Sequence, residues 1–80
     1  MNADNKSARD WLLASSRRSF YDVLKEAKIT PRQQEIAELR FVEGLLNYQI
    51  AMKLNVSVKT VEKELQSAYK AVNRILDKLI

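Results

Sequence analysis

Residues 47–69 read NYQIAMKLNVSVKTVEKELQSAY, and the order of signals in this stretch decides the fold. Asn47 is a suitable N-cap for a short helix, whose apolar side chains repeat at helical spacing: Ile50, Ala51 and Leu54. Asn55 follows, and asparagine tolerates a positive φ better than other non-glycine residues, so a sharp turn is predicted there. Ser57 then offers a hydroxyl cap to a longer helix. A short helix, a tight turn and a longer helix together predict a helix-turn-helix.

The longer helix of this motif has one apolar side and one polar side. Val61, Leu65 and Ala68 recur at helical spacing and are predicted to face the core. The other side carries mostly polar and basic residues: Val58, Lys59, Glu62, Lys63, Gln66 and Lys70. A helix that projects such groups from its N-terminal half suits the major groove of DNA.

A single helix is predicted near the N-terminus, over residues 7–28. Residues 1–6 are polar and are expected to be disordered. Ser7 is followed three residues later by Asp10, a spacing that resembles a capping box at a helix start. The apolar positions that follow fit one helical face: Leu13, Phe20, Val23, Leu24 and Ala27.

The next helix has clearer boundaries. Thr30 supplies an N-cap hydroxyl, Pro31 occupies the first turn, and Gln33 stands three residues after Thr30, where it completes a capping box. Gly44 is the only glycine of the chain and is predicted to end this helix in the left-handed conformation. We therefore predict an all-α fold: one domain over residues 7–80, with about four helices, a helix-turn-helix and a long C-terminal helix.

The composition narrows the functional classes. The 80 residues include no cysteine and no histidine, which excludes disulfides, the usual zinc sites and histidine-based catalysis. There is no glycine-rich phosphate loop either, so neither an enzyme nor a bound cofactor is predicted. One glycine and one proline favour helices with short connections over strands joined by tight turns.

The charge and hydropathy patterns are those of a protein that can meet nucleic acid. The net charge is +4, and residues 57–80 carry five basic and three acidic side chains. Uninterrupted apolar runs are only a few residues long, which excludes a membrane span, and the polar N-terminus is unlike a signal peptide. A cytoplasmic protein is therefore predicted.

The chain also resembles a known family from Ile29 to Ile75, a stretch that begins ITPRQQEIAELRFVEGLLNYQIAMKLNVSVKTVEKELQSAYKAV. This stretch is similar to the LuxR/GerE-type DNA-binding domain and to its structural relative, the fourth conserved region of bacterial sigma factors. Residues 41–45, FVEGL, are closer to sigma factors, while residues 59–62, KTVE, occur in both. The resemblance implies a DNA-binding helix-turn-helix within residues 29–80.

The sequence departs from the family at two positions. The family usually has glycine where Asn55 stands, and it often has a basic or small polar residue in place of Glu62. Nothing outside the matching stretch resembles a receiver, a ligand-binding domain or the core-polymerase-binding region of a sigma factor. A stand-alone regulator or a fragment of a larger one is expected.

Site residues follow from helix geometry together with this resemblance. The residues predicted to reach base edges in double-stranded DNA are Lys59, Glu62, Lys63 and Gln66. Residues at or near helix starts, together with one further lysine, are predicted to contact phosphates: Arg32, Asn47, Tyr48, Gln49, Ser57, Thr60 and Lys70. Tyr69 and Tyr48 can stack on bases, although packing in or beside the core is the favoured interpretation.

The end of the C-terminal helix carries a further apolar repeat. Val72, Leu76 and Leu79 continue the spacing of four and three, which predicts a homodimer interface; alternatively, the first helix covers this face within one chain.

The sequence is compatible with two functions. The first is a transcription regulator that binds specific double-stranded DNA through helix 57–70. The second is a protein-interaction module that contacts RNA polymerase or another regulator, which the modest charge and Glu62 keep open.

Overall fold

The computed structural model describes residues 3–79, and these residues fold into a set of packed helices. Five α-helices and one π-helical turn follow in chain order: α1 (Ala3–Ala14), α2 (Arg17–Ala27), α3 (Pro31–Ala37), η1 (Glu38–Val42), α4 (Asn47–Leu54) and α5 (Val58–Leu79). The all-α fold with a long C-terminal helix is thus confirmed. None of the described helices is long and apolar enough to cross a membrane.

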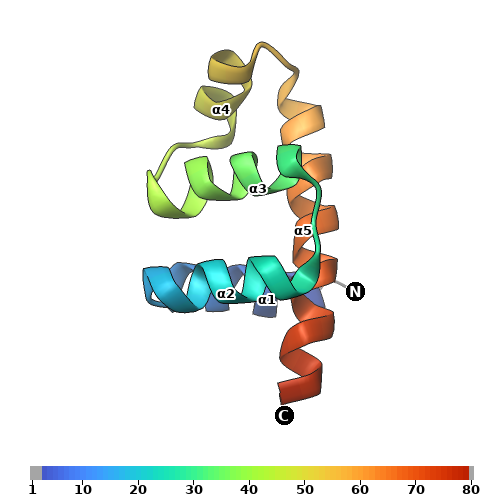
Figure 1. Cartoon of the computed structure of the whole chain (residues 1–80). Coiled ribbons are helices and arrows are strands. Elements are labelled where there is room, and N and C mark those ends of the chain that lie inside the picture. The colour runs from blue at the N-terminus through green and yellow to red at the C-terminus, as the bar shows by residue number, and fades with distance from the viewer. Residues whose placement is uncertain (1–2, 80) are drawn as a thin grey trace.

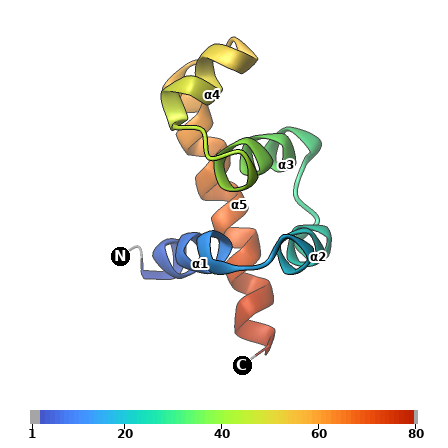
Figure 2. The same cartoon turned by 90° about the vertical axis from the view of Figure 1, so that its left-hand side faces the viewer.

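Helix α5 is the axis around which the other helices are arranged, and it contacts each of the other α-helices. In Figure 1, α4 lies beside the N-terminal end of α5, α3 crosses its middle, and α1 and α2 cross its C-terminal half. Figure 2 shows α1 and α2 on two sides of α5. This arrangement covers the inner side of α5 and leaves its other side open to solvent.

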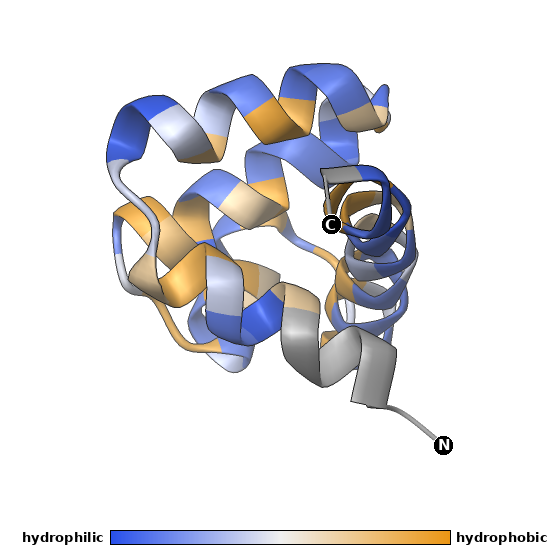
Figure 3. Cartoon of the chain, turned by 90° about the horizontal axis from the view of Figure 1, so that it is seen from below, coloured by the Kyte–Doolittle hydropathy of each residue, from blue (hydrophilic) through white to orange (hydrophobic). Residues whose placement is uncertain are grey.

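The hydrophobic core is formed where these helices meet α5. Val61, Leu65 and Ala68 are at most 3% exposed, which confirms the predicted inward side of the helix, and Val72 is buried on the same side. Three rings from different elements join the core, with Phe41 6.3 Å from Phe20 and 6.1 Å from Tyr69 between ring centroids. Seen from below, the apolar residues gather on helix faces that turn toward one another (Figure 3).

The predicted single helix over residues 7–28 is wrong, because the chain breaks at Ser15 and Ser16. The Ser16 hydroxyl accepts the Ser19 backbone N–H at 3.2 Å and caps α2, while the Ser15 hydroxyl donates to the Leu12 carbonyl. Serine side chains compete with the helical ladder in this way and favour helix ends. The break makes five α-helices of the predicted four.

The break also changes which residues of the first helix face the core. Leu13 is 59% exposed, whereas Leu12 and Ala8 are buried. The seven-residue spacing from Leu13 to Phe20 had suggested one face, but it spans the break and carries no helical meaning. Helix α1 already includes residues 3–6, which were expected to be disordered; residues 1 and 2 lie outside the described part of the chain.

The helix that begins at Pro31 has the predicted start, but α3 ends at Ala37 and continues as η1 to Val42 before it reaches Gly44. Thr30 and Gln33 form a reciprocal capping box, with both hydrogen bonds at 3.1 Å. Gly44 adopts a φ of +76°, as predicted for a left-handed helix end. Between them lies η1, which no signal in the sequence predicted; at its end the Glu43 N–H donates to the Glu38 carbonyl at 3.1 Å. Directly after this π-helical turn, the Leu45 N–H donates a hydrogen bond to the Leu39 carbonyl.

Candidate nucleic-acid interface

The turn between α4 and α5 has the geometry predicted for a helix-turn-helix. Asn55 lies in the left-handed region, with φ 57° and ψ 46°. The Val56 N–H donates to the Ala51 carbonyl at 3.0 Å, closing the end of α4. The Ser57 hydroxyl accepts the Thr60 N–H at 3.1 Å and so caps α5. These local bonds fix the direction in which α5 leaves the turn.

This turn gives a first testable prediction. Asn55→Gly should leave the melting temperature unchanged or slightly raise it, because glycine adopts a positive φ without steric cost. Asn55→Val should destabilise the domain by about 1–2 kcal/mol, because the Cβ of an ordinary residue clashes in the left-handed region and a β-branched one is worse. Thermal denaturation followed by circular dichroism measures both. Equal melting temperatures for Asn55→Val and the wild type would contradict the assigned turn.

The outer side of α5 is a polar surface that we call the reading face: Lys59, Glu62, Lys63, Gln66 and Lys70. All five side chains are exposed, and their spacing of three and four residues aligns them along one side of the helix. Three lysines and one glutamate give this face a net positive charge. No side chain of the face takes part in an ion pair within the described part of the chain. The four residues predicted to reach bases are thus brought together and are free to meet a ligand.

The residues predicted to contact phosphates lie on several helices, and their exposure and hydrogen bonds differ. Lys70 and Tyr48 are exposed, and Tyr48 is 54% accessible. The hydroxyls of Ser57 and Thr60 lie 2.9 Å apart and hydrogen-bond each other at the start of α5. Because each hydroxyl retains further hydrogen-bonding capacity, this bond does not prevent a phosphate contact.

Two of the predicted phosphate contacts, Asn47 and Gln49, lie in the first turn of α4. Asn47 was predicted to be the N-cap, but the cap position is Leu46, and the helix begins at Asn47. A leucine side chain cannot accept a hydrogen bond, so only one half of a capping box is formed here: the Gln49 Oε1 atom accepts the Leu46 N–H at 2.7 Å. The Asn47 Oδ1 atom is buried and has no hydrogen-bond partner among the described residues. Gln49 is therefore a capping residue whose amide nitrogen alone remains available to a phosphate.

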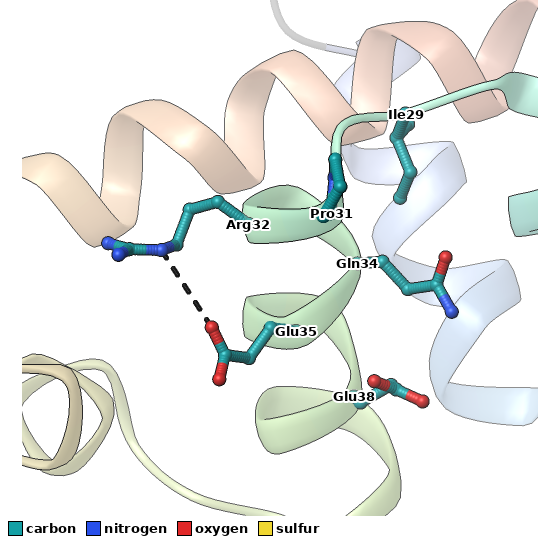
Figure 4. Close-up of a pocket in the computed structure, with 6 residues that line it drawn as sticks. All are labelled: Ile29, Pro31, Arg32, Gln34, Glu35 and Glu38. Atoms are coloured by element: carbon teal, nitrogen blue, oxygen red, sulfur yellow. Dashed lines mark ion pairs between the residues drawn. The ribbon is translucent and has the colours of Figure 1, made fainter.

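Arg32 lies on α3, where it pairs with an acidic side chain. Its Nε atom is 3.8 Å from Glu35 Oε1 (Figure 4). Glu35 and Glu38 both line the shallow pocket beside this arginine, together with Ile29, Pro31 and Gln34. Two carboxylates lower the positive potential available to a phosphate, so Arg32 is less favourably placed than Lys70.

A comparison with protein families identifies the fold. The family model described as sigma-70, region 4 matches residues 27–72, more than half of the chain. The chain belongs to the sigma-70 region 4 family. This family consists of helix-turn-helix domains that typically bind promoter DNA, and it is not a family of enzymes. The match includes α3, α4 and most of α5, whereas nearly all of α1 and α2 lies outside it.

The region 4 domain also has a curated relative. A segment of 34 residues is 59% identical to the probable transcriptional regulator ycf29 of Cyanophora paradoxa. That segment is 42% of this chain but only 16% of the length of ycf29. No solved structure shows significant similarity to the chain.

One contact that positions the reading face was missed by the sequence analysis. Gln33 Nε2 donates to Glu64 Oε1 at 3.1 Å, a bond between the start of α3 and the first half of α5. The same Gln33 amide accepts the Thr30 N–H through its oxygen. Gln33 thus connects the capping box of α3 to the helix that carries the reading face. Its capping role is visible in the sequence, but the bond to Glu64 depends on how the two helices cross.

We expect Gln33→Ala to lower the free energy of unfolding by about 1–2 kcal/mol, because it removes a partly buried side-chain hydrogen bond and half of a capping box. Gln34→Ala is the matched control, since Gln34 is the neighbouring glutamine on the same helix and is exposed. Urea denaturation of both variants measures the difference. Equal losses in the two variants would show that neither the bond to Glu64 nor this half of the capping box contributes to stability.

The burial of two α5 side chains, Tyr69 and Val72, tests two predictions made from the sequence. Tyr69 is 9% exposed, and burial raises the pKa of its phenol above the ordinary value. It therefore packs in the core, as favoured over stacking on a base. Val72 was predicted to form a dimer interface, but it is fully buried within one chain, so this assignment is wrong. Leu76 is partly buried against the same core, and the Leu79 side chain lies outside the described residues.

Proposed function

We propose that this region 4 domain binds specific sequences in double-stranded DNA and regulates transcription, reading the major groove with residues 57–70. The observation that carries the proposal is the reading face. Its lysines are exposed and unpaired among the described side chains, while the opposite side of α5 is held by the core. A helix fixed on one side and polar on the other matches the way recognition helices enter the major groove.

Four of the five members of the reading face have a base that their chemistry suits. Lysine donates hydrogen bonds to guanine O6 and N7, glutamine pairs with adenine, and a glutamate accepts from the cytosine amino group. Lys59, Lys63, Gln66 and Glu62 would supply these contacts, and Lys70 would meet a phosphate further along the helix. The negative charge of Glu62 repels phosphates, so its place on this face favours a base contact and selectivity over affinity.

The phosphate contacts of the proposal come from groups around the helix starts. Tyr48, Ser57, Thr60 and the Gln49 amide nitrogen can donate to phosphate oxygens. The backbone N–H groups of Val58 and Lys59, which precede the capped Thr60 N–H, can do the same at the start of α5. Such contacts set the register of the helix without reading sequence. We also propose a cytoplasmic location, because a regulator of this kind must reach the DNA that it binds.

Selection from a random duplex pool tests this proposal. The wild-type chain should enrich one sequence and bind it more tightly than a scrambled duplex of the same composition. The affinity should fall steeply and linearly in a plot of log K against log salt, by a slope of about 0.9 for each phosphate contact. A chain that enriches no duplex but is retained by RNA polymerase would contradict the proposal and support the protein-interaction alternative.

A further inference from the structure

Val58 is an exposed apolar side chain at the first turn of α5. It is 39% exposed, and the other large hydrophobic residues exposed to this degree lie on α1, on α4 or just before α4. Among the described side chains of α5, it is therefore the one large apolar group presented to solvent. It directly precedes Lys59, the first member of the reading face.

Folding does not account for a valine at this position. Val58 belongs neither to the buried core nor to the partly buried residues packed against it, whereas its neighbour Val56 does. A β-branched residue is also a poorer helix former than lysine, glutamate or alanine, so a solvated helix start gains nothing from it. Single apolar residues are ordinary on protein surfaces, so the inference rests on where Val58 lies.

The location of Val58 is that of a base contact. Val58 and Glu62 are four residues apart and share one side of the helix. The N-terminal residues of a recognition helix are those that approach base edges in the major groove. An isopropyl group forms no hydrogen bond, and the apolar group that base pairs display in this groove is the C5-methyl of thymine.

We propose that Val58 contacts the C5-methyl group of a thymine and selects thymine at that position of the target. This inference rests on the proposed DNA binding and names one element of the sequence that is read. Four helical residues span about 6 Å along the axis, and base pairs are about 3.4 Å apart. The selected thymine should therefore lie within about two base pairs of the base that Glu62 meets.

Removing single methyl groups from the DNA tests the inference. Each thymine of the duplex selected by the wild-type chain is replaced in turn by deoxyuridine, which differs only in the missing methyl. At one position the replacement should weaken wild-type binding about fourfold, the effect of one buried methyl group. The same replacement should leave binding by Val58→Ala unchanged. Met52→Ala is the matched control, because Met52 is an exposed apolar residue of α4 at 78% accessibility; it should retain the wild-type loss.

The outcomes separate this inference from the proposed function. If Val58→Ala stays folded by circular dichroism and loses as much affinity as the wild type at every deoxyuridine position, Val58 reads no thymine, although DNA binding stands. If the pool yields no preferred duplex at all, the proposed function fails and the inference fails with it. A selection repeated with Val58→Ala should also lose the preference for thymine at one position; a retained preference would overturn the inference.

Discussion

Val72→Asp is expected to abolish folding of the domain. Val72 is completely buried on the inner side of α5, so the substitution places a carboxylate without a partner in the core. An unpaired buried charge costs several kcal/mol, and a domain of 80 residues has only a modest free energy of unfolding to lose. Far-UV circular dichroism should show the loss of the helix signal at temperatures where the wild type is folded.

The matched control for this change is Arg74→Asp. Arg74 lies two residues further along α5 and is exposed, so an aspartate there remains in water. The control should keep the wild-type helix signal and melt within about 1 kcal/mol of the wild type. If Val72→Asp instead remains folded and converts a sedimenting dimer into a monomer, the interface first predicted from the sequence would be correct and the packing described here would not.

Lys63→Ala and Gln66→Ala should each weaken binding to the selected duplex by about 1–3 kcal/mol, because each removes a base contact in the major groove. Both side chains are exposed on the reading face, so the melting temperature should not change. Lys25→Ala is the matched control, since it removes one positive charge from the exposed surface of α2, outside the matched region. It should leave affinity for the duplex close to that of the wild type.

Gel-shift or fluorescence-anisotropy titrations at one fixed salt concentration measure these affinities. The comparison must include a scrambled duplex, because loss of a base contact lowers specific binding more than non-specific binding. Equal losses on the selected and the scrambled duplex would mean that Lys63 and Gln66 meet phosphates. No loss on either duplex would place the DNA elsewhere on the domain.

The parts of the fold that sequence could predict were those set by local chemistry. A positive φ at Asn55, the hydroxyl cap of Ser57 and the capping box of Thr30 and Gln33 each depend on residues within three positions of one another. The polar and apolar sides of α5 were also predictable, because helical periodicity separates them directly. These same local features place the reading face on the outer side of α5.

The parts that sequence could not predict depend on how helices cross. The apolar repeat through Val72 is the same whether α1 and α2 of the same chain cover it or a second chain does. The bond from Gln33 to Glu64 joins residues 31 positions apart, and no local pattern signals it. Ser16, a residue type that favours N-caps, stands directly before Arg17 and Arg18 and could have signalled the break. The apolar spacing that continues across it favoured one helix instead. At α4, Asn47 is the better capping residue by type, yet Gln49 satisfies the backbone instead.

The measurement that tests the central claim most directly is a backbone-amide NMR titration of the wild-type chain with the duplex selected from the random pool. The DNA should shift the amide resonances of residues 57–70 most strongly, with smaller changes at the start of α4. The resonances of α2 should remain at their free positions, because α2 lies across the C-terminal half of α5, away from the turn (Figure 1). Changes confined to α2, or none in residues 57–70 when the duplex is in excess, would contradict the claim that this face of α5 reads DNA.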